Sequence, residues 1–347
     1  MLTIAKNLNA VVAAVEAQAA LNFDLTTSLN ALVVFDDGAI LDTRSSAYLD
    51  FTDLGLAQFA RKIELPGPYA ARIRNQNSNL FARSVRHGIR STKETDPSND
   101  LLFRCTTEDG IAKVRAVLTS RYGIIDNAPA LGATLDAFRS LGLDDMSVEG
   151  YSLSPGSFHL RLGDKKSAIN AAKAAGYNSF LPKDVDILYP MLHFYNSEVG
   201  QKSIGLDGGV YRVVCANGLV KPMGDEAGFR KRHFGYTTEE LTAFVVASAE
   251  GILSGAREFA EKFAEGQNIP VVEAETMLKN LFGRARVSRK DEAAILAELG
   301  AQFAGANLNL APVTQYDVVN AITATARELS NTDDRVVLER LAASLVG

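Results

Sequence analysis

Basic residues, grouped in stretches that contain no acidic residue, are the residues of this chain whose type and spacing best suit a binding role. Residues 72–93 carry basic side chains and no Asp or Glu, and residues 230–233 and 279–290 repeat this pattern. Guanidinium and ammonium groups bind phosphate, so several of them along one groove would hold a nucleic acid backbone. The predicted DNA-binding residues are Arg72, Arg74, Arg83, Arg86, Arg90, Lys93, Arg121, Tyr122, Arg212, Arg230, Lys231, Arg232, Arg284 and Arg286.

The charge of the whole chain points the other way. Its net charge is −5 and its pI is about 5.5, which disfavours nucleic acid as a partner when the charges are evenly mixed. Because the cations are segregated, we expect a basic face and an acidic remainder. Solvated helix faces are the alternative for the three stretches. A local ion pair with Glu198 or Asp207 is the alternative for Arg212.

Aromatic residues near these cations could stack on bases. The chain contains no tryptophan, so a stacking surface would have to use tyrosine or phenylalanine. Each candidate has an equal claim to a place in the core. The candidates beside basic residues are Tyr69, Phe81, Tyr122, Phe234 and Tyr236.

The common motifs of nucleotide-driven and nucleophilic catalysis are absent from the sequence. There is no GxxxxGK(S/T) loop, no GxSxG turn and no dinucleotide fingerprint, which disfavours ATP-driven motors, serine hydrolases and Rossmann dehydrogenases. The four histidines lack metal-ligand spacing, so we predict no catalytic residue, metal or cofactor. A metal-dependent hydrolase acting on nucleic acid, built from Asp184, Asp186, His193 and Glu198, is an alternative.

The order of the expected elements predicts an α+β fold, with a largely antiparallel sheet and packed helices followed by an all-helical C-terminal part. Asp37-Gly38 suits the tight turn of a hairpin over residues 32–41, and Asn217-Gly218 suits a turn between strands. The other expected elements are helices at 4–21, 52–62 and 127–141, strands at 111–119, 146–153, 158–162, 187–195 and 210–215, an exposed loop at 92–100, and a glycine-containing turn at 200–209.

The chain changes character at Thr237, where a capping box with Glu240 predicts the start of a long helix. Four more helices are expected, at 271–282, 288–303, 314–329 and 334–345. We therefore expect an N-terminal α/β region with the basic segment (1–105), a central α+β core (106–236) and a helical C-terminal region (237–347).

The composition indicates a cytoplasmic protein that does not enter a membrane. Cys105 and Cys215 are the only cysteines, too few for a disulfide framework, and they are expected to be reduced thiols. No run of apolar residues is long enough to span a bilayer. The first residues also lack the apolar core of a signal peptide.

Several short strings carry a resemblance to a known family. They are residues 120–127 (SRYGIIDN), 196–200 (NSEVG), 211–219 (YRVVCANGL), 232–233 (RH) and 317–323 (DVVNAIT). Together they resemble the phage/plasmid-like protein family, a prophage- and plasmid-borne domain of unknown function. The resemblance covers roughly residues 122–323, and residues 59–69 are also similar. It implies a mobile-element origin and no defined activity.

A second resemblance lies in the pattern from Arg121-Tyr122 through a helix to the Gly142-Leu143 step and a hairpin. This order is similar to RecT, Redβ and Erf-type single-strand annealing proteins. It implies a protein that binds and anneals single-stranded DNA in recombination without ATP, as a ring or filament of identical subunits. The alternatives are an interaction or anti-host scaffold that binds another protein through its C-terminal helices, and the hydrolase above.

Overall fold

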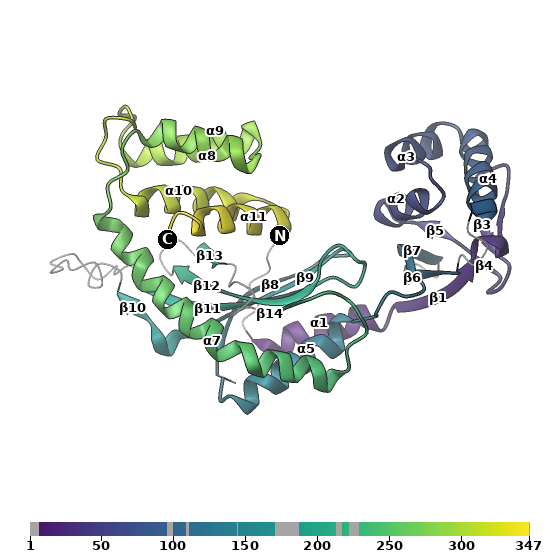
Figure 1. Cartoon of the computed structure of the whole chain (residues 1–347), viewed down its shortest axis with the longest axis horizontal. Coiled ribbons are helices and arrows are strands. Elements are labelled where there is room, and N and C mark those ends of the chain that lie inside the picture. The colour runs from purple at the N-terminus through teal and green to yellow at the C-terminus, as the bar shows by residue number, and fades with distance from the viewer. Residues whose placement is uncertain are drawn as a thin grey trace.

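The computed structural model has the expected α+β fold, with mostly antiparallel sheets and helices at the C-terminal end. Figure 1 shows a larger part built around one long sheet and a smaller part built from the elements between Asn22 and Thr119. The structure describes residues 7–95, 100–108, 111–143, 145–170, 187–212, 217–221 and 229–346.

A seven-stranded sheet forms the centre of the larger part. Its main path follows the order β13-β12-β11-β9-β8, while β10 pairs with β11 and β14 pairs with β12, all antiparallel. The strands are β8 (Ser147–Leu153), β9 (Phe158–Gly163), β10 (Ile169–Asn170), β11 (Ile187–Asn196), β12 (Ile204–Arg212), β13 (Asn217–Lys221) and β14 (Phe229–Lys231).

One face of this sheet is apolar and is covered by helices. Leu160, Leu192 and Leu206 lie on that face and pack into one core with three helices. These helices are α1 (Leu8–Ala19), α5 (Asn127–Ser140) and α7 (Thr238–Glu265). Helix α7 begins with both hydrogen bonds of the predicted Thr237 capping box. Neither α7 nor any other helix in the described residues is long and apolar enough to cross a membrane.

The remaining C-terminal helices lie on the other side of the sheet (Figure 1). They share a second core with the C-terminal half of α7 and with Leu188, Val210 and Leu219 of the sheet. All four agree with the elements expected from apolar periodicity. They are α8 (Ala274–Ala285), α9 (Arg289–Gln302), α10 (Gln315–Glu328) and α11 (Thr332–Ala343), and short 3-10 turns occur at Leu29–Ala31, Lys165–Ser167 and Gly266–Asn268.

The smaller part contains a four-stranded sheet of order β1-β6-β7-β5 and a three-stranded sheet of order β2-β3-β4. The expected division after residue 105 falls inside β6, so residues on both sides of it share one sheet. The elements are β1 (Asn22–Ser28), β2 (Leu32–Val34), β3 (Ile40–Asp42), β4 (Ala47–Tyr48), β5 (Asp50–Phe51), α2 (Asp53–Lys62), α3 (Gly67–Gln76), α4 (Ser78–Thr95), β6 (Asp100–Glu108) and β7 (Ile111–Thr119).

Three local expectations from the sequence are wrong. Residues 204–209 of the expected glycine-containing turn at 200–209 belong to β12 instead, and only 200–203 lie outside a strand. Glycine is needed at position 209 because a Cβ there would lie 2.4 Å from the Leu219 carbonyl oxygen of the neighbouring strand. The Asn217-Gly218 pair belongs to β13 rather than to a turn. The expected loop at 92–100 starts too early, because α4 continues to Thr95.

Candidate nucleic-acid interface

A pocket with basic side chains lies where the loop after β7 meets the chain around β14. It encloses about 690 Å³, and we call it the basic pocket. Three of its side chains are cationic and none is a carboxylate. Its lining residues are Tyr122, Gly200, Gln201, Lys202, Ser203, Arg230, Arg232, His233 and Phe234.

The alternation of the extended chain directs two arginines to this pocket. Arg230 and Arg232 line it, whereas the ammonium of Lys231 lies 4.5 Å from the ring centre of Phe244 on α7. Successive side chains of a strand point to opposite faces. The basic triplet is therefore split between the pocket and the helix behind it.

A close backbone contact joins the two segments that form the pocket. The Gly123 N–H donates a hydrogen bond to the His233 carbonyl oxygen, with the nitrogen and oxygen 3.2 Å apart. A Cβ on Gly123 would lie 1.8 Å from the backbone nitrogen of Gly235, so only glycine permits this approach. This contact places Tyr122 in the same pocket as the two arginines near β14.

Aromatic rings form part of the pocket wall. Tyr122 stacks on His233 with ring centres 5.2 Å apart, and its hydroxyl donates a hydrogen bond to the Ser197 carbonyl oxygen. Burial raises the pKa of Tyr122, which stays a neutral phenol. Phe234 is 70% exposed. An apolar ring in water beside cations is the arrangement on which an unpaired base can stack.

His233 is buried in the wall with both ring nitrogens unpartnered among the described residues. Burial, followed by the nearby charge of Arg104, lowers the pKa of His233 to about 4. The ring is therefore neutral near pH 7. Buried polar atoms without a partner commonly mark a place that a water or a ligand completes.

The three cations of the pocket differ in how they are held. Arg232 is exposed, and the Nε–H of Arg230 donates to the Ser203 hydroxyl, with nitrogen and oxygen 3.0 Å apart. Lys202 is paired with Asp333 of α11. The two arginine side chains are thus open to an anion, and the lysine already has one.

The cations of α3 and α4 lie in the smaller part, and several are engaged there. Arg86 binds the Val34 carbonyl and the Asp36 carboxylate, and Arg72 binds the Gln76 side chain. Arg83 and Arg90 are exposed on one side of α4. Lys93 lies in α4, but its side chain is outside the described part of the chain.

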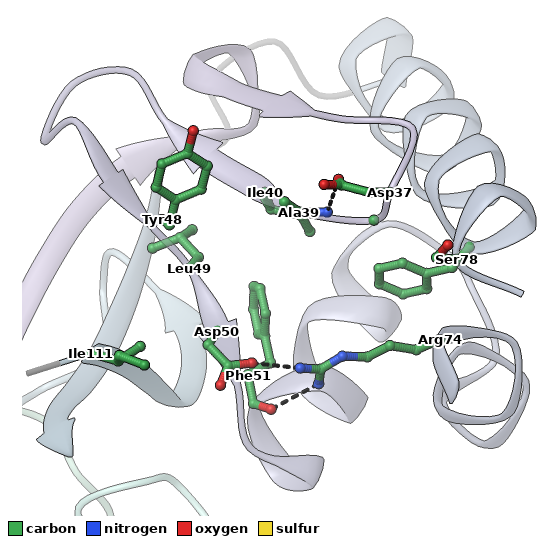
Figure 2. Close-up of a pocket in the computed structure, with 12 residues that line it drawn as sticks. Asp37, Ala39, Ile40, Tyr48, Leu49, Asp50, Phe51, Arg74, Ser78 and Ile111 are labelled. Atoms are coloured by element: carbon green, nitrogen blue, oxygen red, sulfur yellow. Dashed lines mark hydrogen bonds and ion pairs between the residues drawn. The ribbon is translucent and has the colours of Figure 1, made fainter. Parts of the chain in front are cut away.

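Arg74 lines a second pocket, of about 360 Å³, shown in Figure 2. Its guanidinium lies 2.5 Å from Oδ1 of Asp50 and 2.8 Å from the Phe51 carbonyl oxygen. Asp37 and Tyr48 are on other walls of this pocket. Because Arg74 is paired with an acid and Asp37 adds a negative charge, the pocket does not favour phosphate.

Three other predicted DNA-binding residues lie outside both pockets. Nη1 of Arg212 is 3.0 Å from the Asn320 side-chain oxygen, and the guanidinium lies over the Tyr316 ring. Glu198 is paired with Arg115, and Asp207 with Arg340. Arg284 and Arg286 are exposed at the end of α8.

The three basic stretches do not form one continuous surface. Figure 1 places α3 and α4 at one end of the molecule, α8 at the opposite end and β14 between them. Of the predicted residues, the structure brings together Tyr122, Arg230 and Arg232 around the basic pocket, while Arg121 is exposed in the loop just before Tyr122 and does not line the pocket.

The polar face of the central sheet carries a buried network that sequence reasoning missed. The His159 and His193 rings lie 2.9 Å apart between Nδ1 and Nε2, and His159 Nε2 lies 2.7 Å from Oδ1 of Asp333. Arg161 makes a two-pronged ion pair with Glu339 of α11. Burial lowers the pKa of both histidines, so this network is held together by neutral rings and paired charges.

The residues of the hydrolase alternative are not gathered in the described part of the chain. Glu198 accepts from Nη1 of Arg115 and from the backbone N–H of Asn127, which opens α5, while His193 contacts His159. Among the described residues, no group of His, Cys, Asp or Glu is arranged to hold a metal ion. Asp184, Asp186 and Cys215 lie outside those residues.

The chain belongs to a family described as a domain of unknown function (DUF932), which matches residues 157–337. No curated protein and no solved structure matches the chain. The matched region includes all of the pocket's lining residues from Gly200 to Phe234, and Asp333. The Tyr122 side of the pocket comes from the chain before it.

Proposed function

We propose that this chain binds single-stranded DNA through the basic pocket. The observation that carries the proposal is the meeting of Tyr122, Arg230, Arg232 and Phe234 around a pocket whose lining has no carboxylate. Phosphates bind guanidinium groups through charge-assisted hydrogen bonds, and unpaired bases stack on exposed rings. A duplex hides its bases, so the exposed Phe234 favours a single strand.

The biological setting belongs to the same proposal. The resemblance to a prophage- and plasmid-borne family, and in pattern to single-strand annealing proteins, supports a role in annealing during recombination. Annealing needs no nucleotide hydrolysis, in keeping with a sequence that lacks a phosphate-binding loop. In this proposal the protein acts in the cytoplasm as an oligomer of identical subunits.

The test is fluorescence anisotropy with a labelled single-stranded oligonucleotide, at several salt concentrations, beside the same sequence as a duplex. Each phosphate contact to a single strand contributes about 0.7 to the slope of log K against log salt. The double variant Arg230→Gln/Arg232→Gln should therefore reduce the slope by about 1.4 and weaken binding about 25-fold near 0.1 M salt.

The matched control is Arg284→Gln/Arg286→Gln, which removes two exposed arginines at the far end of the larger part. This control should bind as the unaltered chain does. Equal losses in the two double variants would mean diffuse attraction to the whole surface. No binding at low salt would exclude the proposed function.

A protein partner for the C-terminal helices is the second candidate. Val272 is 80% exposed and Leu310 is 83% exposed. The segments that carry them are joined by the hydrogen bond from the Val271 N–H to the Val313 carbonyl. Exposed apolar side chains on adjacent segments favour contact with another protein. Size-exclusion chromatography of Val272→Ser/Leu310→Ser, with and without oligonucleotide, separates this role from DNA binding.

A further inference from the structure

One of the three cations of the basic pocket is bound to an acid from another element. The Lys202 ammonium donates to Oδ1 of Asp333, near the start of α11. Asp333 lines a neighbouring pocket, and Gln201 lines both pockets. The ion pair therefore stands at their junction, with the lysine on the basic side and the carboxylate on the other.

Asp333 is fixed at this junction by further contacts. His159 Nε2 lies 2.7 Å from its Oδ1, and the Ser157 hydroxyl is 3.4 Å from its Oδ2. Burial opposes ionisation, but the hydrogen bonds from His159 and Lys202 outweigh it and lower the pKa of this carboxyl. Asp333 is therefore a held carboxylate near pH 7.

A carboxylate and a phosphate diester present the same chemistry to an ammonium group, which is an anionic oxygen at hydrogen-bond distance. The Lys202 side chain is 27% exposed, and a lysine has a long, flexible stem. Its ammonium has three N–H donors, but Asp333 already neutralises the positive charge, so a phosphate in the basic pocket gains the full attraction of Lys202 only when Asp333 is released. The two anions therefore compete for one cation.

We propose that Asp333 is an intramolecular competitor of the DNA backbone, which keeps Lys202 from the strand until the ion pair opens. This inference rests on the proposed function and adds its regulation. The basic pocket with the ion pair closed presents Arg230 and Arg232 to phosphate, and with the pair open it presents Lys202 as well. Affinity for a single strand is thereby tied to the position of α11.

The test is Asp333→Asn, which keeps the shape of the side chain and removes its charge. One more phosphate contact should tighten binding of a single-stranded oligonucleotide about fivefold near 0.1 M salt and steepen the salt slope by about 0.7. The matched control is Asp334→Asn, because Asp334 is an exposed acid of the same helix turn. It should change the affinity by less than about twofold, as a distant surface charge does in salt.

The source of the gain is tested in a Lys202→Gln background. There Asp333→Asn should no longer tighten binding. An equal gain with and without Lys202, or no gain with it, overturns the inference. So does a gain from Asp334→Asn as large as that from Asp333→Asn.

A second comparison does not need the Asp333 variant to fold. Because Lys202 must first break its ion pair, Lys202→Gln should weaken binding by less than half the factor lost in Arg232→Gln. An equal or larger loss for Lys202→Gln overturns the inference. Absence of binding by the unaltered chain is a separate result, because it removes the proposed function itself.

Discussion

Phe234 offers the most informative single substitution, because its ring is 70% exposed and contributes little to the core. Removing it in Phe234→Ala should leave the fold intact and take away one stacking platform. Stacking of a base on an aromatic side chain is worth about 1–3 kcal/mol, which corresponds to about a 5- to 150-fold loss of affinity. Phe234→Tyr keeps a ring and should retain most of the binding.

The assay is anisotropy titration of a single-stranded oligonucleotide over a range of salt concentrations. Stacking releases no counterions, so the affinity should fall while the slope of log K against log salt stays unchanged. The matched control is Tyr48→Ala, which removes another exposed ring, on β4 in the smaller part. A Phe234→Ala affinity within twofold of the unaltered chain, or a loss that appears as a change of slope, would refute the reasoning.

Three further predictions concern the pocket wall and the core. Gly123→Ala should lower the free energy of unfolding in urea by about 1–3 kcal/mol, because its Cβ would overlap the Gly235 backbone. The control is Gly132→Ala, which has open space around it and should not destabilise the fold. Equal losses of stability in the two variants would contradict the backbone contact. Burial lowers the pKa of His233 from 6.5 to about 4, so between these pH values the unfolded chain binds a proton at this histidine and the folded chain does not. The free energy of unfolding should therefore decrease by about 1.4 kcal/mol for each unit by which the pH drops from 6.5 to about 4. His233→Asn should lose this share of the pH dependence, and an unchanged profile would contradict the prediction. Burial raises the pKa of the Cys105 thiol to about 12, so a Cys215→Ser chain should resist alkylation until it is denatured, and rapid labelling of the native chain would show an accessible thiol.

Local sequence signals were sufficient where one segment determines its own structure. The capping residues Thr237 and Glu240 sit at the start of α7 and make both expected hydrogen bonds. Gly38 adopts the positive φ that the hairpin between β2 and β3 needs. The apolar periodicity of the C-terminal region gave all four of its later helices, because each buries one stripe of side chains against its neighbours.

Signals that depend on distant neighbours were misread or missed. The glycines of β12 suggested a turn, but Gly209 is needed because the Leu219 carbonyl and Met191 approach it from the strands on either side. His159 and Asp333 are 174 positions apart in the sequence, so no local sequence pattern predicts their contact.

The basic surface was predicted in part. Arg230 and Arg232 belong to one of the basic stretches of the sequence and line one pocket with Tyr122, which belongs to none of those stretches. The close contact between the Gly123 and Gly235 backbones brings Tyr122 to the two arginines. The pattern of charges along the sequence does not predict this contact. Arg74 and Arg86 lie in an equally cationic stretch of the sequence, yet the fold pairs each of them with an aspartate, Asp50 and Asp36 respectively.

The central claim is that a single strand occupies the basic pocket, and the absence of tryptophan from the chain allows a direct test. Phe234→Trp introduces one fluorescent indole at the pocket, and Tyr48→Trp introduces one in the smaller part. Stacking of a base should quench the emission of Trp in the first variant, saturably and less at high salt, and leave the second unchanged. Binding detected by anisotropy with no change in the Phe234→Trp emission would contradict the claim.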